Sequence, residues 1–447
     1  MRRFVFDNLI YRINDNKNML FNLTSYRRKV IDNTKLSTLI NIEDKINANV
    51  LLDEYESDLL SELKKCKQIL GNEVEDKVFE TLKKESVIEL KEYAVRAITF
   101  NLTHKCNFSC DYCYQNEYKS HSKYQGIMTI EDIKKIVSYL NLPVFNPVEL
   151  EEIVISGGEP LLEKNIDTIN YICNNIKTNK RTMFTNGINI IKYKNNIDFT
   201  KFDEFQISLD GTDEIMESIN HCRGFEKVIN GIDYLLNLGK KISLITMWSK
   251  QLESNLEEFI SILKDRNFFA NPNFHIRFAS VKNYYNYGKT DTRFYDLEYI
   301  LQCQKKYGSL MKEISSSIEI TSELGVLQGL LHRPLDSQRK IRYKCCDINR
   351  SLPMIFEPNG EVYWCLCLGN ENGVIGNYKS QSIFTDKITE FGNRNVFSID
   401  KCKKCKLKYI CGGGCTLGIT GQDLPLFTPS CGIFNNSFFW DHLEEFV

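Results

Sequence analysis

The residues best suited to chemistry in this chain are its cysteines. Cys106, Cys110 and Cys113 lie in "NLTHKCNFSCDYCYQ", with three and then two residues between them. Three thiolates can hold three irons of a cubane cluster and leave the fourth iron open to another ligand. Zinc is the alternative, but it needs a fourth ligand or a water, and the neighbouring histidine in sequence is His104. Nine more cysteines fall in the last quarter of the chain, at Cys345, Cys346, Cys365, Cys367, Cys402, Cys405, Cys411, Cys415 and Cys431.

Size and composition limit the explanations for these thiols. Disulfide scaffolds belong to small secreted domains, whereas this chain has 447 residues, 16 cysteines and no export signal. No stretch of 18 apolar residues is present, and a net charge of -1 offers no attraction to nucleic acid or to an anionic membrane. We therefore predict a cytoplasmic protein with metal or cluster ligands and without a nucleic-acid or membrane partner. Four scattered cysteines are interpreted as small buried side chains, namely Cys66, Cys173, Cys222 and Cys303.

A repeating βα pattern must position the first three cysteines. Strands are predicted at 97–103, 152–156, 182–185, 204–209, 242–247 and 274–280, with amphipathic helices such as 129–141 and 225–239 between them. Six such repeats predict a parallel sheet with right-handed crossovers, either doubly wound or curled into part of a barrel. In both folds the functional groups lie at the carboxyl ends of the strands, which is where Cys106 stands.

Two further regions flank this α/β segment, which we place at residues 96–295. Residues 1–95 read as short strands, then helical patterns, then a brief strand at 86–90, which predicts a small α+β domain. Residues 296–340 begin with a helix and form a bridge. Residues 341–447 are rich in cysteine and contain a hairpin signal, "PNGEVYWC".

The first cysteine motif resembles the signature of the radical S-adenosylmethionine (SAM) superfamily. The next three strands end in "SGGEP" (156–160), "TNG" (185–187) and "SLDG" (208–211), which resemble the turns that face SAM in that family. The resemblance implies a partial (β/α)6 TIM barrel with a [4Fe-4S] cluster on Cys106, Cys110 and Cys113. The implied SAM contacts are Tyr112, Gly157, Gly158, Glu159, Pro160, Asn186, Ser208 and Asp210.

One position departs from the family pattern. Members commonly carry an arginine in the helix after "SLDG", where it pairs with the carboxylate of SAM. This chain has Asn220 at about that position, and Arg223 and Arg277 are the other candidates.

The late cysteines resemble the SPASM domain, which follows radical SAM barrels and carries two auxiliary [4Fe-4S] clusters. The family arrangement implies one cluster on Cys346, Cys365 and Cys415, and a second on Cys402, Cys405, Cys411 and Cys431. With the barrel cluster, three [4Fe-4S] clusters are implied. Cys367 or Cys345 would complete the first auxiliary cluster, with Cys367 preferred, or that cluster keeps an open iron.

This double resemblance implies radical chemistry on a peptide. In such enzymes the cluster reduces SAM, and the resulting 5'-deoxyadenosyl radical removes hydrogen from an unactivated carbon. Residues 1–95 look like a winged-helix recognition domain that captures a leader peptide as an added strand. We predict a maturase of the sactipeptide, ranthipeptide or SCIFF type, which links cysteine sulfur to carbon in a ribosomally made precursor peptide, with flavodoxin or ferredoxin as electron donor.

Three alternatives remain at this stage. Formylglycine formation of the anaerobic sulfatase-maturase type and carbon-carbon cross-linking would use the same barrel. A zinc-ribbon binding protein would explain "CKKC" but not the first cysteine motif or "SGGEP". The sequence identifies no general base or other catalytic side chain.

Overall fold

The computed structural model describes most of the chain. The described residues are 3–86, 93–113, 115, 125–145, 149–280, 297–316, 318–319, 327, 331, 341–346, 351–365, 373–416, 426–435 and 437–446. Cys367, residues 87–90 of the strand predicted at 86–90, and about half of the predicted bridge lie outside these ranges. Within them, no helix combines the length and the apolar character that crossing a lipid bilayer requires.

The N-terminal module pairs a four-stranded antiparallel sheet with three helices. The sheet has the order β1 (Phe4–Val5), β2 (Asn8–Asn14), β3 (Lys17–Asn22) and β4 (Arg28–Asp32), and α1 (Asn33–Asn47), α2 (Glu54–Lys65) and α3 (Asn72–Ser86) follow. Its own apolar core includes Ile10, Leu20 and Leu39, all fully buried. The sequence predicted the first strands and the last two helices but not β4 or α1. The winged-helix assignment stays a prediction.

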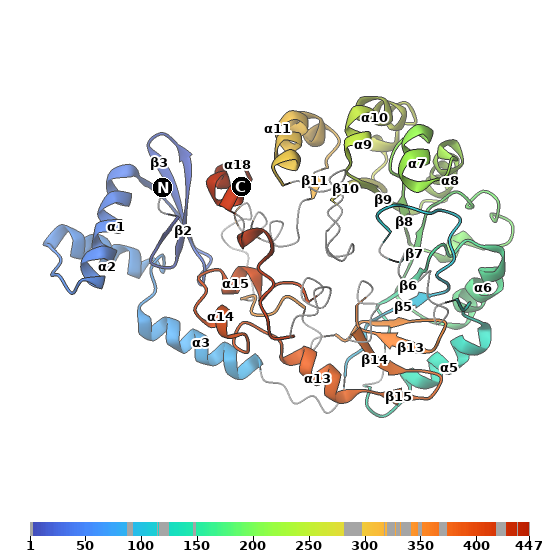
Figure 1. Ribbon diagram of the computed structural model, residues 1–447, viewed down its shortest axis with the longest axis horizontal. Helices are drawn as coiled ribbons and strands as arrows, with labels where there is room; N and C mark the ends of the chain where they lie inside the picture. Colours follow the sequence, from blue (N-terminus) through green and yellow to red (C-terminus); the bar gives the residue numbers. More distant parts are fainter. Residues whose placement is uncertain are drawn as a thin grey trace.

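Six parallel strands form the α/β core, and all six predicted strands are confirmed with ends that move by at most two residues. They are β5 (Ala97–Asn101), β6 (Glu152–Ser156), β7 (Lys180–Thr185), β8 (Glu204–Ser208), β9 (Lys241–Met247) and β10 (Phe274–Ala279). The helices between them are α5 (Ile130–Leu140), α6 (Ile166–Asn175), α7 (Asp213–Asn220), α8 (Phe225–Asn237), α9 (Lys250–Ser254) and α10 (Leu256–Asp265). They cover the outer side of the curved sheet (Figure 1), as expected for a partial barrel.

The C-terminal region extends this sheet instead of forming one of its own. β12 (Met354–Phe356) lies parallel to β5, and β13 (Glu361–Tyr363), β14 (Val374–Asn377) and β15 (Ser382–Ile383) follow antiparallel, which confirms the predicted hairpin. At the other edge, β11 (Ile318–Glu319) lies parallel to β10. Because β13 runs opposite to β12 and β5, residues before β12 and after β13 lie toward the amino end of β5. The first cysteine motif follows the carboxyl end of β5.

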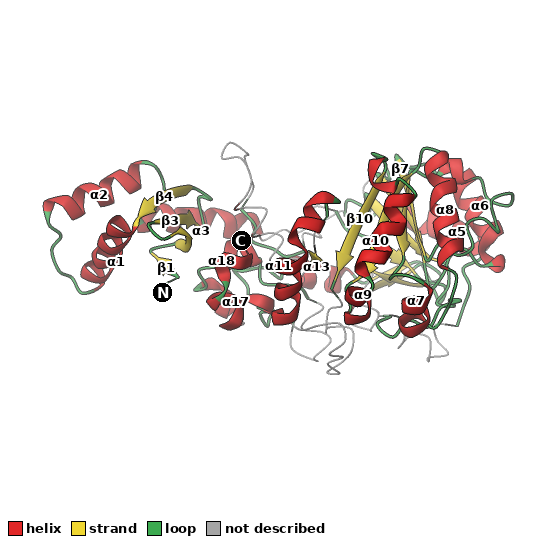
Figure 2. Ribbon diagram, turned by 90° about the horizontal axis from the view of Figure 1, so that it is seen from above, coloured by secondary structure: helices red, strands yellow, loops and turns green. Residues whose placement is uncertain are grey.

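Short helices complete the C-terminal region. They are α13 (Thr385–Asn393), α14 (Asp400–Lys403), α15 (Lys408–Cys411), α17 (Ser437–Asp441) and α18 (Leu443–Phe446), and α11 (Leu297–Glu313) precedes them in the chain. In both views this region lies between the N-terminal module and the barrel (Figures 1 and 2). Tyr26 of the N-terminal module donates a hydrogen bond from its hydroxyl to the carbonyl oxygen of Tyr409, at 2.7 Å. Arg3 pairs with Glu444 of α18.

Candidate active site

A cavity of about 250 Å³ opens at the carboxyl ends of the barrel strands. It brings together residues from all four predicted motifs. Its lining consists of Cys106, Phe108, Cys110, Tyr112, Cys113, Gln115, Ser156, Gly157, Gly158, Phe184, Thr185, Asn186, Gln206, Ser208, Asp210 and Asn220. All three predicted cluster cysteines are present, with six of the eight predicted SAM contacts.

Backbone hydrogen bonds hold the cysteine loop against the end of α7. The amide of Ser109 donates to the carbonyl oxygen of Asn220 at 3.1 Å, and the amide of Asp111 donates to that of Ile219 at 3.0 Å. His221, which ends α7 in a left-handed conformation, pairs with Asp111 at 2.7 Å. The loop that carries the thiols is therefore fixed by a helix that lies about 100 residues further along the chain.

The two glycines of "SGGEP" allow a second close approach to the same loop. The amide of Gly158 donates to the carbonyl oxygen of Thr103 at 2.6 Å. A Cβ at Gly158 would lie 2.4 Å from the carbonyl oxygen of Lys105, and one at Gly157, whose φ is +148°, would lie 2.6 Å from that of Thr103. The sequence predicted that these glycines admit a ligand, and the structure shows that they also admit the backbone that precedes Cys106.

Glu159 and Pro160, the two remaining predicted SAM contacts, do not line the cavity. The Glu159 carboxylate is fully buried and accepts hydrogen bonds from the amide of Leu161 (2.8 Å), the hydroxyl of Thr185 (2.7 Å) and the amide of Asn186 (2.7 Å). Burial raises the pKa of this carboxyl to about 7, although the three donors oppose the shift. Glu159 thus ties the turn after β6 to the turn after β7.

A buried network connects one cysteine to the turn after β8. The Asp210 carboxylate accepts hydrogen bonds from the Tyr112 hydroxyl, from Asn220 Nδ2 at 2.7 Å and from the Met247 amide at 2.9 Å. Asn220 Nδ2 also lies 3.2 Å from Cys110 Sγ. Burial, followed by the nearby Asp210 charge, raises the pKa of the Cys110 thiol to about 12, and burial likewise raises the pKa of Asp210. A bound cation would reverse this effect on the thiol, because metal ligation favours the thiolate.

Asn186 makes a similar contact on the other side of the loop. Its Nδ2 donates to Asn107 Oδ1 at 2.8 Å and lies 3.8 Å from Cys106 Sγ. Two asparagine amides therefore face two of the three sulfur atoms. Hydrogen bonds to cluster sulfurs are one of the means by which proteins tune such a centre.

The structure separates the three candidates for the SAM carboxylate partner. Asn220 lines the cavity, whereas Arg223 and Arg277 do not. Arg223 is exposed and pairs with Glu217 on the same surface. The side chain at the cavity is thus an amide, which can donate a hydrogen bond but carries no charge.

Two groups of thiols form among the C-terminal cysteines. The pKa of Cys346 is raised by the hydrogen bond with the Cys345 thiol, then by burial, and then by Cys415 and Cys365. The pKa of Cys402 is raised to about 11 by burial and by Cys405 and Cys431. Cys415 therefore interacts with Cys346, although it lies in the same short run of sequence as Cys402 and Cys405. Cys411 lies at the end of α15, before the Gly412 turn.

The scattered cysteines differ from one another. Cys303 is buried as predicted, and Cys173 and Cys222 are partly buried. The prediction is wrong for Cys66, which is exposed because it caps the carboxyl end of α2 on its lysine-rich side. His104, the neighbour considered as a zinc ligand, instead places Nε2 2.7 Å from Glu357 Oε2 in the hairpin that joins β12 and β13.

Comparison with known proteins identifies the α/β core. Residues 100–263 match the model of the Radical SAM superfamily. The chain contains a radical SAM domain. Enzymes of this superfamily bind a [4Fe-4S] cluster and SAM, and the cavity offers such groups three cysteines and polar side chains that include Asn186 and Asp210. Among the described residues, no three His, Cys, Asp or Glu side chains converge to hold a single metal ion.

Individual relatives share this domain at low identity. The GTP 3',8-cyclase of Campylobacter jejuni subsp. doylei is 26% identical over 265 residues, which cover 57% of this chain and 79% of that protein. The GTP 3',8-cyclase of Peptoclostridium acidaminophilum is 26% identical over 247 residues, covering 53% and 70%. These two matches cover little more than half of the chain.

Two solved structures share a larger part of the fold. Native anSMEcpe with bound AdoMet is 19% identical with a TM-score of 0.53, covering 78% of this chain and 97% of that one. Streptococcus suis SuiB bound to precursor peptide SuiA is 17% identical with a TM-score of 0.57, covering 96% and 99%. The likeness to SuiB therefore includes the regions on both sides of the radical SAM domain.

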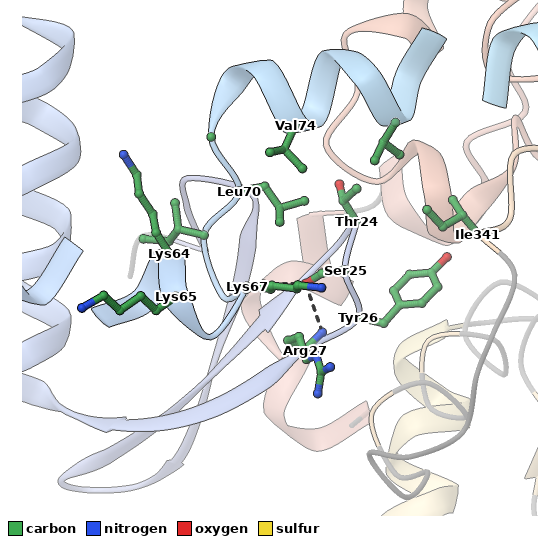
Figure 3. A pocket seen from close by; sticks show the side chains of 13 residues that line it. Thr24, Ser25, Tyr26, Arg27, Lys64, Lys65, Lys67, Leu70, Val74 and Ile341 are labelled. Carbon is green, nitrogen blue, oxygen red and sulfur yellow. Dashed lines mark hydrogen bonds between the residues drawn. The ribbon is translucent and has the colours of Figure 1, made fainter. Parts of the chain in front are cut away.

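A second, larger cavity of about 720 Å³ lies in the N-terminal module. Figure 3 shows it between the turn that joins β3 to β4, the end of α2 and the first turns of α3. Its apolar surface includes Leu70, Val74, Val78 and Ile341. Its positive charge comes from Arg27, Lys64, Lys65 and Lys67. The sequence analysis did not predict this cavity, because it requires the turn before β4 to lie beside α3.

The sequence analysis also missed several lining residues of the radical SAM cavity, including Phe184, Gln206 and Gln115. A weak signal was available for Gln206, because it is a polar residue inside the apolar strand "EFQISL". Alternate residues of a strand point to opposite faces, and Gln206 and Ser208 share the face that lines the cavity.

Proposed function

We propose that this protein is a peptide maturase that forms thioether links between a cysteine sulfur and a carbon atom of a precursor peptide. The observation that carries the proposal is the pair of thiol sites at opposite ends of β5. Cys106, Cys110 and Cys113 follow its carboxyl end, whereas Cys346 and Cys365 flank the β12–β13 hairpin toward its amino end. The likeness to SuiB, solved with a precursor peptide, supports a peptide substrate.

The two ends have separate tasks in this reaction. When bound at the first site, cluster and SAM supply a 5'-deoxyadenosyl radical, which takes one hydrogen atom from the substrate carbon. Joining that carbon to the cysteine sulfur then releases one proton from the thiol and one electron. The proposed auxiliary cluster at Cys346, Cys365 and Cys415 would accept that electron, and the product is lighter by two hydrogen atoms.

The side chains of the first site bind and orient. Asn220 and Tyr112 hold the Asp210 carboxylate toward the cavity, and Asn186 and Asn220 direct their amides at sulfur atoms. Glu159 fixes the two turns between which the cavity opens. These contacts would hold SAM and a substrate carbon in one orientation, which is the main task of the protein in cofactor-based radical chemistry.

The N-terminal module would bind the leader of the precursor. β4 is an edge strand of its sheet, so one side of it can accept an added strand. The larger cavity lies at the start of β4 and offers an apolar wall for a leader side chain (Figure 3).

The activity test uses reduced, iron-reconstituted protein, SAM and any short cysteine-containing peptide encoded beside its gene. We expect a product about two mass units lighter per link, with its cysteine blocked to alkylation. Peptide without its leader should react poorly, and Val74→Lys in the cavity should weaken binding of the full precursor. Val50→Lys is a matched control, because Val50 is similarly exposed (53% against 49%) but lies outside the cavity. SAM cleavage without loss of two mass units from peptide would contradict the proposal.

The auxiliary clusters have their own test. Cys415→Ala should remove about 4 of about 12 irons per chain, since one of three [4Fe-4S] clusters loses a ligand. Cys173→Ala should keep all of them, because Cys173 belongs to neither group. Equal iron in both variants would contradict the assignment of Cys415.

GTP cyclisation is the second candidate, because curated relatives of the radical SAM domain carry that name. The same reduced protein should be incubated with GTP and SAM. Consumption of GTP with no change in peptide would favour this candidate over the maturase.

A further inference from the structure

The carboxyl end of α13 lies where three of the C-terminal cysteine segments meet. Lys344, which precedes Cys345, donates from Nζ to the carbonyl oxygen of Gly392 at 2.7 Å. The amide of Val396 donates to the carbonyl oxygen of Tyr343 at 3.1 Å. The segment that carries Cys345 and Cys346 is thus attached to both sides of Arg394, the residue that caps α13.

Arg394 reaches from there to the other cysteine segments. Its guanidinium donates to the carbonyl oxygens of Gly413 (2.9 Å) and Gly414 (2.8 Å). It also donates to those of Leu426 (2.8 Å) and Thr428 (3.0 Å), which precede Cys431. One side chain therefore holds the turn before Cys415 and the strand of backbone that leads to Cys431.

The turn that Arg394 holds cannot be replaced by ordinary residues. Gly412, Gly413 and Gly414 all have positive φ, at 65°, 87° and 76°. A Cβ at Gly412 would lie 2.6 Å from the carbonyl carbon of Lys344, and one at Gly414 would lie 1.7 Å from the carbonyl oxygen of Ser430. The turn therefore packs tightly between Lys344, which precedes Cys345, and Ser430, which precedes Cys431.

Arg394 is also a buried charge, with 5% of its surface exposed. Its hydrogen-bond partners are all backbone carbonyls, and no carboxylate pairs with it in the described part of the chain. Burial lowers the pKa of the Arg394 guanidinium. Nearby thiols from both groups raise it, namely those of Cys345, Cys346, Cys402 and Cys415. A buried cation without a counter-ion is costly, whereas thiolates that ligate iron would supply negative charge on both sides.

We propose that Arg394 is a positioning residue shared by the two C-terminal thiol groups, and that its positive charge offsets the negative charge of their thiolates. The inference rests on the two auxiliary clusters proposed above, but not on the substrate. A nearby positive charge stabilises the more negative, reduced state of a centre, so it raises the reduction potential.

The test compares Arg394→Lys, which keeps the charge, with Arg394→Gln, which keeps hydrogen-bond donors but removes the charge. Arg266→Gln is the control, because Arg266 lies on the barrel surface and pairs with Glu226 and Asp233. Iron per chain and the midpoint potentials of the clusters, followed by electron paramagnetic resonance, are measured after anaerobic reconstitution. In Arg394→Gln the ratio of reduced to oxidised auxiliary cluster at a fixed potential should fall at least about tenfold, which is ~59 mV for one electron.

The outcomes test the role of the Arg394 charge and the presence of the auxiliary clusters. Arg394→Lys should retain the iron and potentials of the parent. Arg394→Gln should either show the lower potential or lose iron from the C-terminal groups while keeping the barrel cluster. Parent potentials and full iron in Arg394→Gln, or equal damage in both variants, would overturn the charge assignment. A parent with only about 4 irons per chain would overturn the auxiliary clusters as well.

Discussion

Replacing Glu159 with glutamine probes how the turns around the radical SAM cavity are joined. One carboxylate oxygen accepts from Leu161 N–H and the Thr185 hydroxyl, and the other accepts from Asn186 N–H. A glutamine has one acceptor oxygen, so its NH2 group must face one of the two buried amides. An unsatisfied buried donor costs about 1–3 kcal/mol.

The ionisation of Glu159 makes the free energy of opening these turns depend on pH, and the size of this effect is a second prediction. The pKa of Glu159 rises from 4.5 to about 7 on burial. A carboxyl whose pKa is raised in the folded state contributes stability that is full below pH 4.5 and is lost as the pH rises through about 7. Between pH 5 and pH 8 the free energy of opening these turns should therefore fall by about 2–3 kcal/mol in the parent.

Hydrogen exchange followed by mass spectrometry measures this locally, in peptides that contain Leu161 and Asn186. After correction for intrinsic exchange rates, the parent should show protection that falls between pH 5 and pH 8. Glu159→Gln should show less protection at pH 5 and no such slope. Glu163→Gln, an exposed neighbour, is the control and should behave as the parent. The same slope in Glu159→Gln, or protection in the parent that rises with pH, would refute the reasoning.

Three further predictions concern other contacts. Gly158→Ala places a Cβ 2.4 Å from a backbone oxygen of the cysteine loop, so it should cost about 1–3 kcal/mol and reduce iron retained at the first site, measured by iron analysis. Asn220→Ala removes a donor from buried Asp210 and should weaken SAM binding in calorimetry by roughly 5-fold to 150-fold, whereas unchanged affinity would exclude a role at the cavity. Tyr26→Phe removes the hydroxyl that donates to Tyr409, so about 1 kcal/mol should be lost between the N-terminal module and the C-terminal region, seen as faster limited proteolysis of that junction.

The sequence located the radical SAM strands well because each is a short apolar run that ends at a polar turn. β6, for example, occupies the predicted residues 152–156. Strand ends predict where side chains gather, so Cys106 and Asp210 could be assigned to one edge of a sheet before its order was known. β4 escaped prediction because "RKVID" is short and largely polar, as suits an edge strand.

The roles of Glu159 and Asn220 and the position of β12 could not be predicted. They depend on contacts between residues far apart in the chain, which leave no local pattern in a single sequence. Glu159 belongs to a motif that resembles a SAM-binding turn, yet its carboxylate accepts hydrogen bonds from the protein itself. Asn220 departs from the family arginine, and only the fold shows that it lies beside Cys110. The placement of β12 next to β5 likewise has no local signal, since "MIF" resembles many other short apolar runs.

Because β13 runs opposite to β5, the first cysteine motif and the Cys365 segment lie toward opposite ends of β5. This separation bears on electron transfer between the two proposed clusters. β5 has five residues and is roughly 16 Å long, and the two thiol sites lie beyond its opposite ends. In the proposed thioether maturase, a substrate residue held between them would form part of the route from one centre to the other. Without substrate, the sheet would keep the two centres apart. Electron transfer between them would then depend on a bound peptide.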